Sequence, residues 1–309
     1  MPFVKKNFHV GEEIRAFLFL IRHFGMSQGE AQRLIARGRL LVAGESMIDR
    51  AGNIQGDIEI VYFEPKDRGV KPLFYNKDFA LYEKESGVLV HPKTMKTPYS
   101  LLDEIRTHAG DHANAVHRID METSGLLMAS KHKRAESFLK TSFEKRTIKK
   151  SYLAWVDGCV EKSFSVEVPL RVRDDYSANK HKVCVSADGK HALTFFEPLE
   201  YDPQLGATLL ACYPHTGRTH QIRVHLFHVK HPILGDPIYG VSFAAANDYL
   251  EGRLSDEGRM REMGASRLML HAQSLKFHYK SDFEIHSKVD FRGMKTLICL
   301  KVERRFNKR

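Results

Sequence analysis

Residues 115–130 place a compact polar cluster directly before a short apolar run. The run at 126–129 is continuous and bounded by a glycine and by charged residues, which predicts a strand buried in a sheet. Periodicity alone also allows a buried helical turn. If the run is a strand, Asp120 lies on a loop at its entrance, where a rigid sheet can hold a reachable catalytic carboxylate. The plainer alternative is a solvated turn carboxylate that accepts hydrogen bonds from its neighbouring backbone.

The composition is that of a globular chain, long enough for a large core and one small accessory domain. Of its 309 residues, 42% are hydrophobic and 28% are charged. No stretch approaches the ~18 consecutive apolar residues of a membrane helix, and the first residues lack the apolar core of a signal peptide. We therefore expect a cytoplasmic protein with no membrane partner.

The four cysteines are far apart in the sequence and form no Cys-x-x-Cys pair. This spacing indicates neither a zinc ribbon nor a disulfide framework. We expect all four to be reduced and most of them to lie in the core.

The charge is strongly positive, with 48 Lys and Arg against 38 Asp and Glu, a formal net charge of +10. A basic chain is biased toward polyanionic partners, although charge alone names no reaction. Residues 130–150 contain eight basic residues and two glutamates, which gives this segment a local net charge of +6. This segment is either a solvated helix face or a track for RNA phosphates.

Residues 11–65 have the pattern of a small separate unit. The apolar spacing within 14–21 predicts one amphipathic helix. The Ser-x-x-Glu pattern at 27–30 is a capping box and predicts the start of a second helix. Strand-like runs follow at 39–42 and 58–63. We therefore predict a first domain over 1–65, a polar linker over 66–72 and a second domain over 73–309.

The second domain mixes strand and helix patterns. The runs at 79–84 and 87–92 predict two strands around a tight bend, and the alternation from Tyr152 predicts another. The apolar spacing of 135–143 predicts an amphipathic helix. Residues 163–200 alternate and turn repeatedly, which predicts peripheral antiparallel strands.

Histidines are concentrated in one segment, at His220, His225, His228 and His231. Such a group raises the alternative of a metal site. No acidic residue or cysteine lies at helical ligand spacing beside them, so we predict that no metal is bound.

Four segments together resemble the signatures of the RluA family of RNA pseudouridine synthases. The first reads His-Arg-Ile-Asp at 117–120, followed by Thr-Ser-Gly at 123–125, and the second reads Lys-Ser-Tyr-Leu-Ala-Trp-Val-Asp-Gly at 150–158. The third reads Gly-Arg-Thr-His-Gln-Ile-Arg-Val-His at 217–225, with Gly-Asp-Pro-Ile-Tyr-Gly at 235–240, and the fourth reads Arg-Leu-Met-Leu-His-Ala at 267–272.

The resemblance implies an α+β fold, with a mixed, largely antiparallel sheet in a catalytic domain that follows a small α+β RNA-binding domain. It implies that Asp120 is the catalytic carboxylate, that Arg223 pairs with it, and that Tyr152 stacks on the target base. Leu270 would press on the opposite face of that base. The residues that the resemblance assigns to substrate binding are His117, Arg118, Thr123, Leu270, Arg218 and His220.

Two short helices followed by a hairpin in residues 1–65 resemble the alpha-L RNA-binding module that many family members carry ahead of the catalytic domain. A purely structural helical cap is the alternative. The basic residues expected to hold the RNA backbone are Arg33, Arg37, Arg39, Lys145, Arg146, Lys149 and Lys150.

The reaction implied by the resemblance breaks the N-glycosidic bond of uridine, turns the uracil and joins its C5 to C1′, without cofactor or metal. Asp120 could attack C1′, attack the ring or abstract a sugar proton.

We expect a monomer. Its expected partner is large-subunit ribosomal RNA, with transfer RNA as the alternative. A non-catalytic RNA-binding or ribosome-assembly factor and a metal-dependent nuclease are the competing hypotheses. Residues 241–266 carry no chemistry that the sequence assigns.

Overall fold

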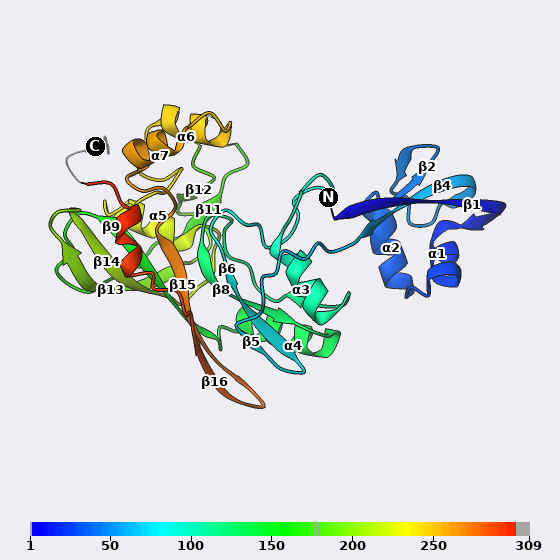
Figure 1. Cartoon of the computed structure of the whole chain (residues 1–309), viewed down its shortest axis with the longest axis horizontal. Coiled ribbons are helices and arrows are strands. Elements are labelled where there is room, and N and C mark those ends of the chain that lie inside the picture. The colour runs from blue at the N-terminus through cyan, green and yellow to red at the C-terminus, as the bar shows by residue number, and fades with distance from the viewer. Residues whose placement is uncertain (1, 176, 178–179, 301–309) are drawn as a thin grey trace. The chain divides into compact units, whose positions relative to one another are not determined.

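The computed structural model describes residues 2–175, 177 and 180–300. The chain forms two compact units (Figure 1): the first contains Met1–Gly69 and His91–Thr107, and the second contains Val70–Val90 and His108–Arg309. The first break falls inside the predicted linker 66–72, whereas residues 91–107, predicted within 73–309, lie with the first unit. That residues 1–65 and 73–309 behave as separate domains stays a prediction.

Residues 3–63 of the first unit form a four-stranded antiparallel sheet with two helices on one side of it (Figure 1). Its elements are β1 (Phe3–Arg15), α1 (Ala16–Phe24), α2 (Gln28–Ala36), β2 (Leu40–Val42), β3 (Glu45–Met47) and β4 (Asn53–Phe63). The strand order is β1-β4-β2-β3. The apolar faces of both helices and of the sheet form one buried core.

The predicted capping box is confirmed, because the Glu30 N–H donates to Ser27 Oγ at 3.4 Å and the Ser27 N–H donates to Glu30 Oε2 at 3.1 Å. The predicted helix over 14–21 is wrong at its start. The strand β1 continues to Arg15, and Ile14 pairs with Ile54 of β4. Since Ile14 packs on the same core as the helix, its apolar spacing did not separate strand from helix.

The segment after β4 is bound to α3 (Leu101–Ala109), whose residues 101–107 belong to the first unit. The backbone N–H groups of Lys66 and Arg68 donate to Asp103 Oδ1 at 3.1 Å and to Glu104 Oε1 at 2.7 Å. Both carboxylates are buried. These long-range bonds explain why residues 91–107 lie with the first unit.

The second unit is built on a ten-stranded mixed sheet. The strand order is β10-β13-β14-β9-β15-β8-β6-β5, with β16 paired to β15 and β7 paired to β8. The pairing of β15 with β8 is parallel and the other strand pairs of this sheet are antiparallel, which confirms the expected α+β class and largely antiparallel sheet. The strands are β5 (Phe74–Tyr75), β6 (Phe79–Lys84), β7 (Asn114–Ala115), β8 (Ser124–Ser130), β9 (Lys149–Asp157), β10 (Phe164–Glu167), β13 (Leu193–Asp202), β14 (Ala207–Pro214), β15 (Leu270–Tyr279) and β16 (Ser281–His286).

A separate hairpin and several helices complete the second unit. They are β11 (Leu170–Val172), β12 (Val183–Val185), α4 (Lys133–Glu144), α5 (Gln221–His228), α6 (Phe243–Leu250), α7 (Asp256–Met263) and the 3₁₀ helix η1 (Gly293–Leu297). The predicted helix over 135–143 is confirmed as part of α4, and the predicted peripheral strands are confirmed as β10 to β13.

The apolar run at 126–129 lies in β8, and all seven residues of this strand are buried, which confirms the predicted buried strand. At its start, Gly125 has φ +106°, and a Cβ there would lie 2.3 Å from the carbonyl oxygen of Ala272 in β15. Only glycine permits this approach of the two parallel strands.

The second strand predicted at 87–92 is wrong, because the chain forms a loop there. The cause is Lys84, whose buried ammonium donates to the carbonyl oxygens of Glu85, Val88 and Met121, each at 2.8 Å. The three N–H bonds of one ammonium thus satisfy carbonyls that a strand partner would otherwise bind. The contact with Met121 also ties this loop to the segment that carries Asp120.

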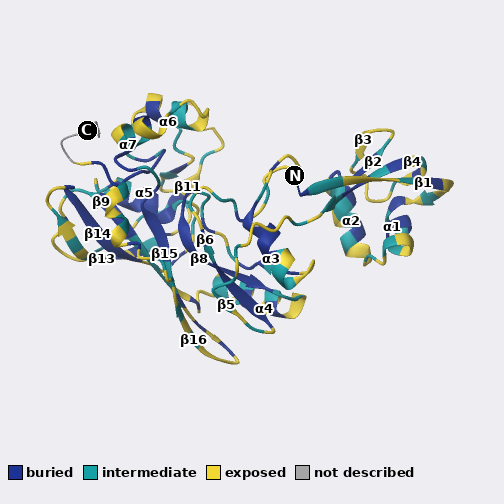
Figure 2. Ribbon diagram, viewed as in Figure 1, coloured by how far each residue is buried: buried dark blue, intermediate teal, exposed yellow. Residues whose placement is uncertain are grey.

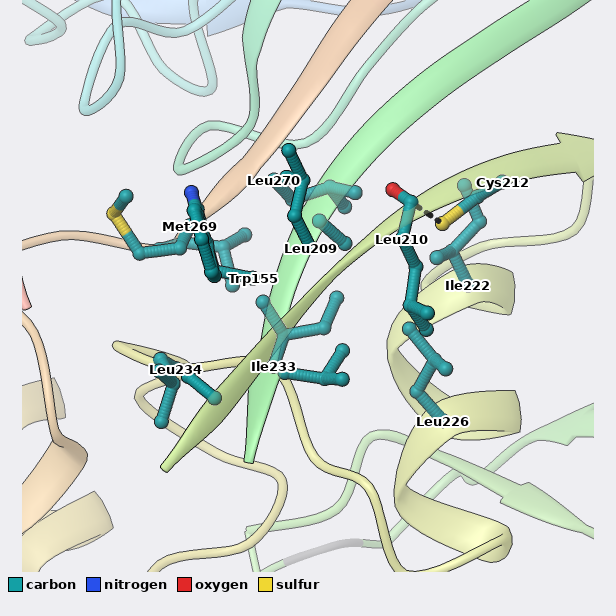
Figure 3. Packing of buried hydrophobic residues seen from close by; sticks show 14 of the residues in the cluster. Trp155, Leu209, Leu210, Cys212, Ile222, Leu226, Ile233, Leu234, Met269 and Leu270 are labelled. Atoms are coloured by element: carbon teal, nitrogen blue, oxygen red, sulfur yellow. Dashed lines mark hydrogen bonds between the residues drawn. The ribbon is translucent and has the colours of Figure 1, made fainter. Parts of the chain in front are cut away.

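Burial is greatest along the central strands (Figure 2). One apolar cluster lies between α5 and strands β9, β14 and β15, with Trp155 fully buried (Figure 3). A second cluster lies between α4 and strands β6, β8 and β15. These two clusters hold the elements that meet at the site described below.

The cysteines are less buried than predicted. Cys212 and Cys299 are buried, whereas Cys184 is half-buried and Cys159 is exposed. No helix among the described residues is long and apolar enough to cross a membrane.

Candidate active site

A cavity of about 500 Å³ opens in the second unit where the 116–123 loop, α4, β9 and α5 meet. It brings together all nine residues predicted for catalysis and substrate binding, although they lie up to 153 residues apart in the sequence. Those nine residues are His117, Arg118, Asp120, Thr123, Tyr152, Arg218, His220, Arg223 and Leu270.

Asp120 lies in a tight turn immediately before β8. The Thr123 N–H donates to the Asp120 carbonyl oxygen at 3.1 Å, and the bond from Lys84 to Met121 holds the middle of the turn. The Asp120 side chain is 21% exposed, so the carboxylate is reachable from the cavity while its backbone is fixed. This arrangement differs from a solvated turn carboxylate, the alternative that the sequence left open.

Arg223 on α5 connects two carboxylates. Its Nη1 donates to Asp120 Oδ2 at 3.2 Å, while Nε and Nη2 donate to the two oxygens of Asp236 at 2.7 and 2.8 Å. The side chains of Arg223 and Asp236 are 3% and 1% exposed. A bidentate pair of this geometry fixes the plane of the guanidinium, and so it fixes the donor that faces Asp120.

Asp236 is a site residue that the sequence analysis missed. Besides Arg223, its Oδ1 accepts the backbone N–H groups of Ile238 and Tyr239, each at 2.9 Å. The signal was present in the Gly-Asp-Pro-Ile-Tyr-Gly segment at 235–240, but nothing in that segment indicated its partner thirteen residues earlier.

The surroundings of Asp120 favour its ionised form. Burial raises the pKa of Asp120, but the positive charges of protonated His220 and of Arg223 lower it more, so the pKa lies below the ordinary carboxyl value. His220 is neutral at pH 7, because burial lowers its pKa to about 4. Arg223 is therefore the cation that keeps Asp120 ionised at neutral pH.

His220 precedes α5 with a left-handed backbone, at φ +54°, and its ring lies between Asp120 and Tyr239. The Tyr239 oxygen accepts the Val183 N–H at 3.2 Å, and the Tyr239 hydroxyl lies 2.9 Å from His220 Nδ1. Tyr239 thereby links the His220 ring to the strand β12. His220 Nε2 lies 3.7 Å from Asp120 Oδ2.

Tyr152 and Leu270 form the apolar part of the cavity. Leu270 in β15 is opposite Ala154 of β9, two residues after Tyr152, so both side chains lie on one face of the sheet. Burial raises the pKa of Tyr152, so its hydroxyl stays protonated at pH 7. The structure brings the two residues together, but their contact with opposite faces of a base stays a prediction.

The other predicted substrate-binding residues differ in how they are held. His117 Nε2 accepts the Met128 N–H at 3.0 Å, and its ring stacks on Phe143 at 4.4 Å, so this imidazole also supports β8. Arg218 is held by a bond from its Nε to the carbonyl oxygen of His191 at 3.0 Å. Arg118 is exposed and lies at the cavity mouth.

The residues predicted to bind the RNA backbone are divided between the two units. Arg146 and Lys150 line the cavity, whereas the exposed Lys145 and Lys149 lie outside it. The remaining three, Arg33, Arg37 and Arg39, belong to the first unit. The guanidinium of Arg39 lies 4.7 Å from the ring centre of Phe3, and burial together with the charges of Arg37 and Arg106 lowers its pKa to about 10.

Within the described residues, no three His, Cys, Asp or Glu side chains are grouped so as to hold a metal ion. His225 lies in the core and is fully buried, whereas His220 and His231 are half-buried and His228 is exposed. Of the four histidines, His220 lies beside Asp120, and His231 Nδ1 lies 2.9 Å from the Asp157 carbonyl oxygen.

Two core histidines make the stability of the fold depend on pH. His225 and His271 are buried, and burial lowers the pKa of each to about 4, from 6.5. Between these values the unfolded chain binds more protons than the folded chain, so stability is complete above pH 6.5 and falls as the pH drops toward 4. We expect each histidine to lower the unfolding free energy by about 1.4 kcal/mol per pH unit in this window.

Urea unfolding at pH 7, 6 and 5 measures this slope. His271→Gln is expected to reduce the dependence of the unfolding free energy on pH by the contribution of one histidine. His278→Gln, an exposed control on the same strand β15, is expected to leave this dependence unchanged. An identical slope in wild type and His271→Gln contradicts the prediction.

Comparisons with known proteins place the chain among related sequences and folds. Residues 78–228 match the family described as RNA pseudouridylate synthase. An RNA pseudouridine synthase of Helicobacter pylori is 38% identical over 281 residues, which cover 91% of this chain and 92% of the relative. The ribosomal large subunit pseudouridine synthase D of Nitrosomonas europaea is 35% identical over 202 residues, which cover 64% of this chain and 56% of the relative.

The solved structure of human RNA pseudouridylate synthase domain containing 1 is similar in fold, with a TM-score of 0.60 and 23% identity over 77% of this chain and 91% of that one. The fold and the sequence relatives together define an RNA-modifying isomerase. The chain belongs to the RNA pseudouridine synthase family, which confirms the RluA-type resemblance of its four segments.

Proposed function

We propose that this pseudouridine synthase modifies uridines in large-subunit ribosomal RNA, with Asp120 as its catalytic carboxylate. The observation that carries the proposal is the pairing of Asp120 with the buried Arg223 inside the 500 Å³ cavity. An RNA-binding protein without activity would have no need for a fixed carboxylate in a cavity that receives a polyanion. The reaction does require one such group next to the sugar or the ring.

The geometry supports a carboxylate that is ready to react. Arg223 stabilises the charged form of Asp120 and directs its oxygens into the cavity. His220 Nε2 lies 3.7 Å from Asp120 Oδ2, and in the tautomer with its proton on Nε2 it would donate a hydrogen bond to Asp120 or to the bound nucleotide. The reaction involves neither oxidation nor hydrolysis, so these side chains supply its chemistry without a cofactor or metal.

The target base would be flipped out of its stack into the cavity, between Tyr152 and Leu270. The exposed Arg118 and the residues Arg146 and Lys150 at the cavity would contact the phosphates on either side. The arginines of the first unit would bind a second part of the same RNA.

The role of Tyr152 is tested by comparing two substitutions. Base–aromatic stacking contributes about 1–3 kcal/mol, so Tyr152→Ala is expected to lower kcat/KM by about 10- to 100-fold. Tyr152→Phe keeps the ring and is expected to retain at least about tenfold more activity than Tyr152→Ala. Tyr213→Ala removes an exposed tyrosine from the neighbouring strand β14 and is the matched control. Equal losses in Tyr152→Phe and Tyr152→Ala would show that the hydroxyl, and not stacking, is required.

Ribosomal RNA is favoured because a relative that is 35% identical bears the name ribosomal large subunit pseudouridine synthase D. We also propose that the protein acts as a monomer in the cytoplasm, where its RNA substrate is found.

The experiment uses RNA labelled with 5-[³H]uridine and separated into large-subunit, small-subunit and transfer RNA. Forming the new bond at C5 expels the tritium, so release measures the reaction directly. Release from large-subunit RNA is expected. If tritium is released only from transfer RNA, then transfer RNA is the target and the proposed ribosomal target is wrong. If the protein binds every RNA fraction but releases no tritium, the proposed activity is contradicted.

A further inference from the structure

Glu122 is a buried carboxylate that the proposed chemistry does not use. It lies two residues after Asp120 in the same turn and is 7% exposed. Its Oε1 accepts the hydroxyl of Tyr249 at 2.5 Å, and its Oε2 accepts Nη2 of Arg259 at 2.5 Å. A carboxylate this deeply buried is stable only because both oxygens are bound by strong donors.

The two donors come from the helical segment to which the sequence assigned no role. Tyr249 lies on α6 and Arg259 on α7, both beyond the residues 78–228 that match the family. Each helix starts at a serine whose side chain accepts a backbone N–H, Ser242 for α6 and Ser255 for α7. These caps bind N–H groups that would otherwise be unpaired and so stabilise the two helices that carry the donors.

The two donors also support one another. The guanidinium carbon of Arg259 lies 5.0 Å from the ring centre of Tyr249. Burial and the nearby Glu122 raise the pKa of Tyr249, so its hydroxyl remains a proton donor at neutral pH. The side chain of Arg259 is 15% exposed, and its charge is directed to Glu122 instead of to solvent.

Arg259 also reaches the second half of the catalytic pair. Its Nη2 lies 3.4 Å from the carbonyl oxygen of Gly235, the residue before Asp236. Asp236 in turn binds Arg223. One guanidinium therefore contacts both the turn that carries Asp120 and the segment that orients its partner.

We propose that α6 and α7 act as a clamp that sets the position of Asp120 against Arg223, with Glu122, Tyr249 and Arg259 as positioning residues. None of the three residues lines the cavity. The effect of the clamp is therefore on the alignment of the carboxylate with the reacting nucleotide. This inference rests on the proposed function of Asp120.

A positioning role predicts a specific kinetic pattern. A misplacement of about 1 Å can lower a rate by about 10²-fold, so Arg259→Met is expected to lower kcat by about 10- to 100-fold. The KM for RNA is expected to stay within about twofold, because the RNA-contacting residues are untouched. Tyr249→Phe removes one of the two donors to Glu122, and a smaller loss of about 3- to 10-fold is expected.

Two further variants separate positioning from folding. Arg259→Lys retains the charge but has no planar fork, so an intermediate kcat is expected. The double variant Glu122→Gln with Arg259→Met is expected to be no slower than Arg259→Met alone, because both changes break the same contact. Arg261→Met is the matched control, since this exposed arginine lies on the same helix and pairs only weakly, at 3.5 Å, with Glu262.

Tritium release from RNA is measured at saturation, well below the melting temperature of each variant, and rates are normalised to folded protein. Hydrogen exchange of residues 118–124 is measured on the free protein, where faster exchange in Arg259→Met than in Arg261→Met is expected. If Arg259→Met has the kcat of wild type and the hydrogen exchange of residues 118–124 is unchanged, the proposed clamp is wrong. If wild type itself releases no tritium from any RNA, the proposed function fails instead, and exchange alone then decides whether the helices hold the turn.

Discussion

Asp120→Asn is expected to abolish tritium release while the protein stays folded. The amide is close in shape to the carboxylate but cannot act as a base or nucleophile, so we expect activity to fall by about 10³-fold or more. Arg223 retains its two bonds to Asp236 in this variant, so the buried guanidinium keeps a charged partner. Melting temperature and RNA affinity are therefore expected to change little.

The control for this substitution is Asp282→Asn, the same change at an exposed aspartate of the β15–β16 hairpin. Its activity is expected to equal that of wild type. Tritium release by Asp120→Asn at more than a few per cent of the wild-type rate would show that another group performs the chemistry. Loss of RNA binding in Asp120→Asn would show that this carboxylate serves the pocket's structure instead.

Asp236→Asn is expected to damage both activity and fold. Its carboxylate is 1% exposed and binds Arg223 twice, so the substitution leaves a buried guanidinium without its main counter-charge. Removing one partner of such a pair costs about 3–5 kcal/mol of unfolding free energy. The guanidinium is then free to turn, and kcat is expected to fall at temperatures where the variant is still folded.

Urea unfolding compares this variant with Asp248→Asn, which breaks the exposed pair of Asp248 with Arg253. Exposed pairs contribute about 0–1 kcal/mol, so this control is expected to lie within that range of wild type. Similar unfolding free energies for the two variants would contradict the structural importance of Asp236. A destabilised Asp236→Asn with wild-type kcat would show that Arg223 needs no second carboxylate to hold its position.

Local patterns predicted much of the fold correctly. The continuous apolar run at 126–129 became the fully buried β8, and the capping box at 27–30 begins α2 as its spacing requires. These predictions succeeded because strand burial and helix capping depend on residues within a few positions of one another. The predictions at 14–21 and 87–92 failed where a distant partner decided the local structure, Ile54 for β1 and Met121 for the Lys84 loop.

The site shows the same division. The sequence by itself determined which chemical groups the chain offers, including Asp120, Tyr152 and Arg223. Each of these residues lies in a continuous segment that could be compared with a family signature residue by residue. Only the tertiary structure decided that Arg223 divides its bonds between Asp120 and Asp236, and that Arg259 holds Glu122 from 137 residues away. The physical reason is that a hydrogen bond or ion pair depends on separation in space, and no local pattern encodes which distant strand or helix will supply the partner.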